Sequence, residues 1–343
     1  MKQEMFILVL LACTALSANA KIWRVNNTPG VVANFNTVAA AVAAAAAGDT
    51  IYIEGSATNY SGATVNKKLT FIGTGYFLSG TNSNPGLQAN GNNAYIGAIM
   101  IDSAGSGSVF LGLAGLNFYN ASPAGFGTDN ITISRCQLTS ISLYYGAGAG
   151  TIGDGWNINK CHIGTINGNI GAMRNWNVSN NIFTGGLDLS NTAGSNNVIR
   201  NNVFRSSINL YNAYFANNII YYDPNFTNVV VKNNLAIGNP ASFVSYVGSN
   251  GNSAGHTDAL MFQGLTGNST DGQWRLAVSS PAIGAGLTVG AVVTPDAGAF
   301  GGPDPYKLSG IPPIPAIYSL TVPAAIPSGS NSMNINFSSK NNN

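Results

Sequence analysis

The chain has 343 residues, only 8% of them are charged, and its formal net charge is +2. Nucleic-acid recognition needs a dense basic surface, so this composition argues against nucleic acid as a partner. A content of 45% apolar residues in regular alternation argues against an intrinsically disordered chain.

Residues 1–20 have a basic start, an apolar stretch and an Ala-x-Ala end at Ala18 and Ala20. This pattern predicts a secretory signal peptide, and therefore a protein that is secreted, extracellular or on the outer cell surface. No later apolar run approaches the ~20 residues that a spanning helix needs, so no membrane span is predicted.

Residues 35–48 predict one short helix. The segment is rich in alanine, Asn36 or Thr37 can cap its start, and Gly48 can supply a left-handed stop. One helix ahead of many strands suits a cap over the open apolar end of a stacked β structure.

A short phrase then recurs, in which apolar residues alternate and a polar pair follows. The phrases end at Cys136, Cys161, Asn181, Asn202, Asn218 and Asn234, which are spaced 25, 20, 21, 16 and 16 residues apart. A second short strand follows most phrases, and one strand-like segment per repeat of about 20 residues is typical of a solenoid. The sequence therefore predicts an all-β fold, a right-handed parallel β-helix whose asparagines stack as a ladder at the turns.

The two cysteines of this repeat, Cys136 and Cys161, occupy the same place in consecutive phrases. Adjacent turns lie about 4.8 Å apart, within the separation that a disulfide tolerates, and secretion permits oxidation. Two buried thiols stacked as small apolar residues are the other interpretation, and both stay open.

The pattern loosens after residue 239. Residues 279–286 and 296–302 are expected to form the last turns of the solenoid. The chain is thus divided into a signal peptide (1–20), a parallel β-helix with its N-terminal cap (21–302), a proline-rich linker (303–316) and a C-terminal strand tail (317–343). The tail holds too few strands for its own core, so we expect it to dock on the solenoid or to pair with something else.

Several segments of this solenoid resemble the pectin-lyase-like superfamily of right-handed parallel β-helices, over roughly residues 35–302. Residues 37–48, 49–54, 68–75, 280–284, 296–302 and 310–323 are similar to segments of secreted β-helix proteins of Bacteroidota. The superfamily includes polysaccharide lyases, hydrolases, epimerases and non-enzymatic surface proteins, so the resemblance does not name a reaction. Its lyases typically use a carboxylate cluster that holds Ca²⁺ beside an Arg or Lys base.

Seven residues before successive phrase ends stand Asp129, Asp154 and Arg174. In a regular stack the two carboxylates would lie one turn apart, with a guanidinium on the next turn. They are the candidate catalytic or cation-binding group. The alternative is that the aspartates are turn residues and that Arg174 neutralises them.

Aromatic residues supply the candidate ligand-binding surface. Tyr144, Tyr145, Tyr221 and Tyr222 lie at turns, where tyrosines can bind sugar rings. Trp156 and Trp176 share the inward parity of their phrases, which favours a core role. His162, beside Lys160, is interpreted as a histidine in a polar turn.

The scarcity of acidic residues and the lack of a clustered site favour a non-catalytic protein that binds glycan or serves as a structural or assembly module. The alternative is a polysaccharide lyase or related carbohydrate-active enzyme, the one case that implies a cofactor, Ca²⁺. Neither the sequence nor its spacing predicts a metal site. The expected partners are an extracellular polysaccharide or further copies bound through the C-terminal tail.

Overall fold

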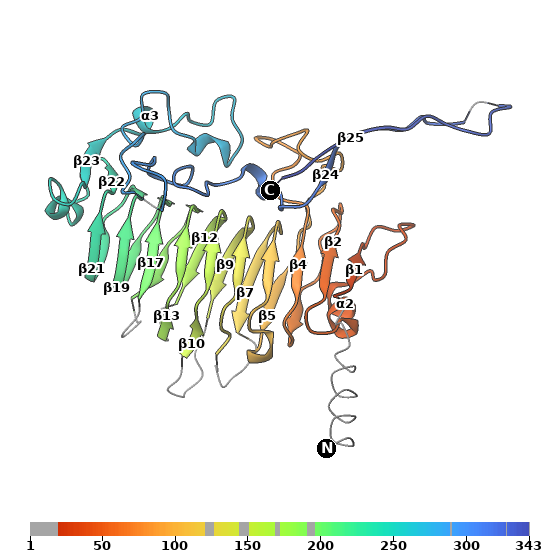
Figure 1. The fold of residues 1–343 in the computed structure, drawn as a ribbon, viewed down its shortest axis with the longest axis horizontal. Helices are drawn as coiled ribbons and strands as arrows, with labels where there is room; N and C mark the ends of the chain where they lie inside the picture. The colour runs from red at the N-terminus through yellow and green to blue at the C-terminus, as the bar shows by residue number, and fades with distance from the viewer. Residues whose placement is uncertain are drawn as a thin grey trace, which may run out of the picture.

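The structure is a computed structural model, which describes residues 20–120, 127–143, 151–168, 172–190, 196–288, 290–326 and 328–342. The predicted signal peptide lies outside these residues, apart from Ala20. Within them the chain forms a long parallel β-helix whose turns stack side by side (Figure 1). The all-β solenoid predicted from the repeat is confirmed.

Three stacks of parallel strands, here called faces A, B and C, make up the solenoid. Face A contains β1 (Ile22–Val25), β2 (Thr50–Ile53), β4 (Thr70–Ile72), β6 (Val109–Leu111), β8 (Thr132–Ser134), β11 (Asn157–Asn159), β14 (Asn177–Ser179), β17 (Asn197–Arg200) and the second halves of β19 (Ile208–Ala216) and β21 (Pro224–Lys232). Face B contains β3 (Ala63–Val65), β5 (Ala98–Ile101), β7 (Leu116–Asn120), β9 (Gln137–Ser142), β12 (His162–Asn167), β16 (Leu187–Leu189) and the first halves of β19 and β21. Face C begins at the first residues of β9 and β12 and continues through β15 (Ile182–Phe183), β18 (Val203–Phe204), β20 (Ile219–Ile220), β22 (Leu235–Ile237) and β23 (Ser253–His256).

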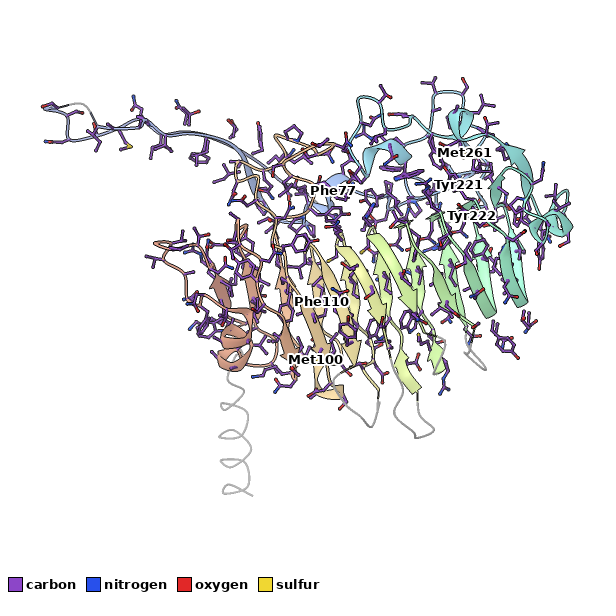
Figure 2. All side chains as sticks on the ribbon, turned by 180° about the vertical axis from the view of Figure 1, so that it is seen from behind. Phe77, Met100, Phe110, Tyr221, Tyr222 and Met261 are labelled. Carbon is purple, nitrogen blue, oxygen red and sulfur yellow. The ribbon has the colours of Figure 1, made fainter. Side chains whose placement is uncertain are left out.

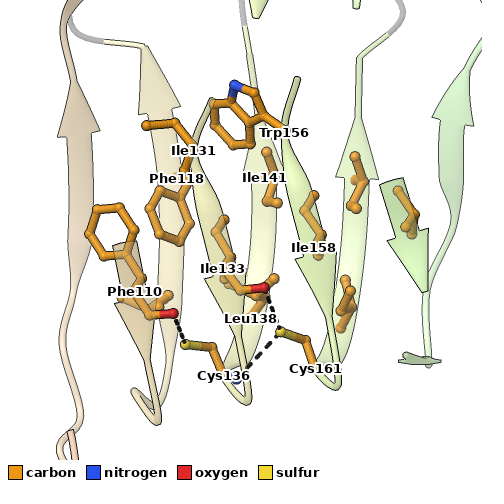
Figure 3. Packing of buried hydrophobic residues seen from close by; sticks show 14 of the residues in the cluster. Phe110, Phe118, Ile131, Ile133, Cys136, Leu138, Ile141, Trp156, Ile158 and Cys161 are labelled. Atoms are coloured by element: carbon orange, nitrogen blue, oxygen red, sulfur yellow. Dashed lines mark hydrogen bonds between the residues drawn. The ribbon is translucent and has the colours of Figure 1, made fainter. Parts of the chain in front are cut away.

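Side chains alternate between the interior and the outside along each strand, which places one residue per face A strand in the core. The central residue of β1, Trp23, is partly buried. Those of the other face A strands are buried, and they are Ile51, Phe71, Phe110, Ile133, Ile158, Val178, Ile199, Phe215 and Val231. Figure 3 shows part of this core beside the corresponding residues of face B. Trp156 and Trp176 stack within it, with ring centroids 4.9 Å apart and planes 7° apart, which confirms their core role.

The predicted asparagine ladder runs through the interior of the turn between faces A and C. Its members are the buried residues Asn181, Asn202, Asn218, Asn234 and Asn252. Each side-chain oxygen accepts the backbone N–H of the preceding member, as in the 2.9 Å bond from Asn181 to Asn202. Each side-chain amide also donates to a carbonyl one turn back. The ladder thus supplies hydrogen-bond partners to buried backbone groups that have none in the paired strands.

Cys136 and Cys161 continue this ladder as free thiols. The backbone N–H of Cys136 points at Cys161 Sγ, 3.4 Å away, where an asparagine oxygen stands on later turns (Figure 3). Both residues are fully buried, and burial raises the pKa of the Cys161 thiol well above its ordinary value. The structure has the stacked buried thiols, one of the two interpretations that the sequence left open.

The residue before each ladder position adopts a left-handed backbone conformation. These residues, called here the left-handed column, are Arg135, Lys160, Asn180, Asn201, Asn217 and Asn233, with φ between 52° and 57°. Asparagine tolerates this conformation, whereas Arg135 and Lys160 adopt it at a cost of about 1 kcal/mol each.

The left-handed column holds the C-terminal part of the chain against the solenoid. Residues 279–311, here called the strap, run back along it toward the N-terminal end (Figure 1). The column side chains bond the strap in order: Asn233 to Ala285 O, Asn217 to Leu287 O, Asn201 to Asp296 O, Asn180 to Ala299 O and Gly301 O, Lys160 to the Asp304 carboxylate, and Arg135 to Ile311 O.

A second apolar core lies outside face C. Its solenoid side is Ile182, Val203, Ile219 and Leu235, and its outer side is Met261, Phe262, Trp274, Ala282, Ala297 and Ala299. Figure 2 shows Met261 above the strands of the solenoid. Besides α3 (Asp258–Met261), this covering layer contains the short turns η3 (Gly272–Trp274) and η4 (Leu308–Gly310).

This arrangement corrects the expectation of further solenoid turns near the end. Residues 279–286 and 296–302 contain no strand and lie on the outside of face C as part of the strap. Residues 303–316 do not run free as a linker, since Tyr306 is buried and Arg135 Nη1 donates to Ile311 O at 2.8 Å.

The N-terminal helix is present and shorter than predicted. Helix α2 (Val38–Ala44) is capped by Thr37, whose Oγ1 accepts the N–H of Ala40 at 3.2 Å. It ends at Ala45, in extended conformation, so Gly48 turns the chain into β2 and does not end the helix. At the other end of the core, η2 (Phe243–Tyr246) buries Phe243.

Elements outside the three faces are few. The turn η1 (Ser103–Gly105) follows β5, and β10 (Thr151–Asp154) pairs with β13 (Ala172–Arg174) at the corner before face A. Strands β24 (Ala316–Thr321) and β25 (Asn336–Lys340) form an antiparallel hairpin beyond the strap.

Candidate functional site

Asp129, Asp154 and Arg174 lie on successive turns, in the register that the repeat predicted. Asp154 pairs with Arg174 between β10 and β13, and Asp129 Oδ1 accepts the backbone N–H of Asp154 at 2.8 Å. Asp154 Oδ1 in turn accepts the side-chain amide of Asn175 at 2.7 Å. Arg174 is exposed and forms no ion pair with either aspartate among the described residues. Both carboxylates thus act as hydrogen-bond acceptors that hold one turn on the next.

Every acidic residue that the structure describes likewise accepts a hydrogen bond. Of the twelve acidic residues, Glu4 lies outside the described residues, and each of the remaining eleven accepts a hydrogen bond from a protein group. These eleven are Asp49, Glu54, Asp102, Asp129, Asp154, Asp188, Asp223, Asp258, Asp271, Asp296 and Asp304. Within the described ranges, no three His, Cys, Asp or Glu side chains form a group that could hold a metal ion.

The tyrosine candidates differ in their surroundings. Tyr144 and Tyr145 lie outside the described residues. Tyr221 packs between Phe262 and Trp274, and its hydroxyl donates to the Asp258 carboxylate. Burial, and next this hydrogen bond, raise the pKa of Tyr221 far above its ordinary value. Its neighbour Tyr222, labelled in Figure 2, is 59% exposed. Tyr222 lines a shallow pocket with Arg205. Of the two candidate tyrosines that the structure describes, Tyr222 is the exposed one, and it lies beside Arg205 and Asp223.

An uncharged groove lies on the outside of face A near the end of the solenoid. Its volume is about 500 Å³, and its lining contains no acidic or basic residue. Val198, Tyr214 and Val230 stand side by side in it, one from each of the neighbouring strands β17, β19 and β21. Three amide side chains border this apolar strip, those of Asn196, Asn212 and Asn228. Asn228 donates its side-chain amide to the Asn212 oxygen, so the amides are themselves stacked.

His162 is buried, and not in a polar turn as the sequence suggested. It begins β12 under the edge of Phe77, with ring centroids 5.2 Å apart, and its Nε2 has no hydrogen-bond partner among the described residues. Burial lowers its pKa to about 4, although the nearby Asp271 carboxylate acts in the opposite direction. The neutral ring therefore fits a packing role beneath the covering layer.

Comparison with known proteins gives no further guidance. No protein-family model matches the chain, and no curated protein is significantly similar to it. In the part of the chain that the structure describes, no helix is long and apolar enough to cross a membrane.

Sequence reasoning did not find the face A groove. The signal was present, because Asn212 and Asn228 each stand five residues before Asn217 and Asn233, and all four residues adopt the left-handed conformation. The same residue type forms the buried ladder, so the sequence alone does not distinguish Asn212, which is partly exposed, and Asn228, which is exposed, from the ladder asparagines.

Proposed function

We propose that this chain is a secreted, non-catalytic β-helix protein that binds a neutral polysaccharide in the groove on face A. The observation that carries the proposal is the groove itself, in which amides and a tyrosine meet and no charged side chain intrudes. Amide groups can donate to and accept from sugar hydroxyls, while Tyr214 and its valine neighbours offer apolar surface to the C–H face of a sugar ring.

The hydrogen bonds that the carboxylates accept from the protein support a non-catalytic role. Glycoside hydrolysis needs two carboxyl groups that are free to exchange protons or attack the sugar, and lyases of this fold need carboxylates for Ca²⁺. Asp129 and Asp154, the nearest approach to such a pair, each accept a hydrogen bond that joins two turns.

Affinity electrophoresis in gels that contain soluble neutral glucans, galactans or xylans tests the binding site. We expect retardation by at least one of them and, for Tyr214→Ala, a roughly fivefold weaker affinity, since an aromatic contact contributes about 1 kcal/mol. Tyr222→Ala is the matched control, an exposed tyrosine outside the groove. Loss of binding in Tyr222→Ala with unchanged binding in Tyr214→Ala would place the ligand in the other pocket and reject this groove.

The same protein preparations test the alternative that this protein is a polysaccharide lyase. Incubation with polygalacturonate and Ca²⁺ should produce no unsaturated product that absorbs in the ultraviolet. Product formation would reject the non-catalytic role, and its dependence on Asp154, measured with Asp154→Ala, would show whether the group Asp129, Asp154 and Arg174 is responsible.

A further inference from the structure

The hairpin β24–β25 presents an apolar face to solvent. Leu320 pairs with Phe337 across the two strands, so their side chains share one face. Val322 and Ile335 stand next to the strand ends, two residues from Leu320 and Phe337, and are exposed too. Ile317, next to a bulge, shares with Leu320 a groove at the hairpin root. These five residues, here called the hairpin face, are between 45% and 64% exposed. The opposite face carries polar residues such as Thr321 and Asn336.

The hairpin is fixed at its root and cannot turn this face toward the core of its own chain. Arg135 Nη1 donates to Asn342 O at 2.9 Å, and the backbone N–H of Ala89 donates to Ile317 O at 2.8 Å. From this root the two strands run outward past the N-terminal end of the solenoid (Figure 1). A two-stranded hairpin without a packed face is marginally stable in water, so the hairpin face needs a covering surface.

Two properties of the hairpin favour the hairpin of a second copy of this chain as the covering surface. Residues 316–342 carry one charged side chain, Lys340, so two hairpins meet without repulsion, whereas a charged partner would find no complement. Five half-exposed apolar side chains leave roughly 500 Å² per copy, and a face-to-face pair therefore buries roughly 1,000 Å², the lower limit for a specific interface.

The root leaves room for such a partner. A groove of about 670 Å³ lies between the hairpin and the solenoid. Its hairpin side is apolar, with Ile317 and Leu320, and its solenoid side is mixed, with Tyr52, Glu54 and Asn90. The hairpin face thus borders open space at its root.

We propose that two copies of this chain associate about a two-fold axis by packing their hairpin faces together. A contact that uses the same patch on both copies closes after two, so the product is a dimer and not a filament. This inference is independent of the polysaccharide proposal, since the groove on face A lies on other strands.

Sedimentation velocity between about 1 and 100 μM tests the association. We expect a reversible monomer–dimer equilibrium for the wild-type protein. Leu320→Asp should weaken it by about 100-fold or more, because each dimer would bury the new charge twice. Thr321→Asp is the matched control, with the same charge on the polar face, and should leave the dimer intact. A wild-type protein that stays monomeric, or equal weakening by both substitutions, would overturn the proposal.

Cross-linking tests the geometry. The native Cys136 and Cys161 are fully buried, so in a Cys13→Ser background an introduced thiol is the accessible one. Mild oxidation should join Phe337→Cys into a covalent dimer and leave Asn336→Cys, on the opposite face, monomeric. Covalent dimers of Asn336→Cys, or a series of oligomers larger than the dimer in sedimentation, would show a different contact and reject the two-fold hairpin pair.

Discussion

Lowering the pH should destabilise this protein through His162. Burial lowers the pKa of the imidazole from 6.5 to about 4, and the opposing effect of Asp271 is smaller. Nε2 has no partner in the part of the chain that the structure describes, so a proton added there would not be stabilised by a hydrogen bond.

The sign and size of the effect follow from proton linkage. Between pH 6.5 and pH 4 the unfolded chain carries a proton on His162 that the folded protein does not accept. The contribution of His162 to the free energy of unfolding is therefore fully present above pH 6.5. It is lost as the pH falls toward 4, where the folded protein binds the proton too. One pKa unit corresponds to about 1.4 kcal/mol, so the full loss is about 3 kcal/mol.

Urea unfolding, followed by tryptophan fluorescence at several pH values from 7.5 to 4, measures this loss. His162→Leu should remove the acid-dependent part, because an apolar side chain of similar size fills the space beside Phe77. His256→Gln is the control for the second histidine, whose pKa is also lowered by its partial burial. Asp49, whose pKa is lowered by its hydrogen bonds, affects stability only below its ordinary value of 3.8, outside this window. The same pH slope in His162→Leu and wild type would refute the reasoning.

Three further substitutions test the ladder and the strap. Asn202→Ala removes the hydrogen-bond partners of buried backbone groups and should lower the free energy of unfolding by about 3 kcal/mol. Asn225→Ala, at an exposed strand position, is the control and should change that free energy by less than about 0.5 kcal/mol. Urea unfolding measures both. Gly310→Ala should release the strap, since an added Cβ would lie 2.2 Å from Arg135 O, and faster proteolysis of residues 279–311 would report the release. Lys160→Met removes an ion pair whose acid is largely exposed, so a melting temperature within about 2 °C of wild type is expected, and a larger fall would contradict that assignment.

The solenoid could be predicted because its determinants are local. Alternation of period two marks each strand, and residues such as Asn202 and Asn218 recur at the spacing of one turn. The inward parity of Trp156 and Trp176 placed both correctly in the core. The register of Asp129, Asp154 and Arg174 also followed from counting along the repeat.

The covering layer could not be predicted, because its contacts join distant parts of the chain. His162 is buried by Phe77 and by the layer that carries Asp271, each more than 80 residues away. Nothing near Lys160 in the sequence indicates Asp304, 144 residues later. The segment 279–302 also retains the short apolar runs of a solenoid turn, although they pack on the outside of face C.

The strap has a consequence for how this protein can change in length. An ordinary solenoid gains or loses a turn with little effect elsewhere, because each turn contacts only its neighbours. Here the strap bonds six successive turns in order, from Asn233 to Arg135. The length of the strap must therefore match the length of the stack. A duplicated turn would add about 4.8 Å to the stack, which corresponds to about 1.5 residues of extended strap. Insertions in the repeat and in the strap should therefore occur together, and a repeat duplicated alone would leave every contact beyond it out of register.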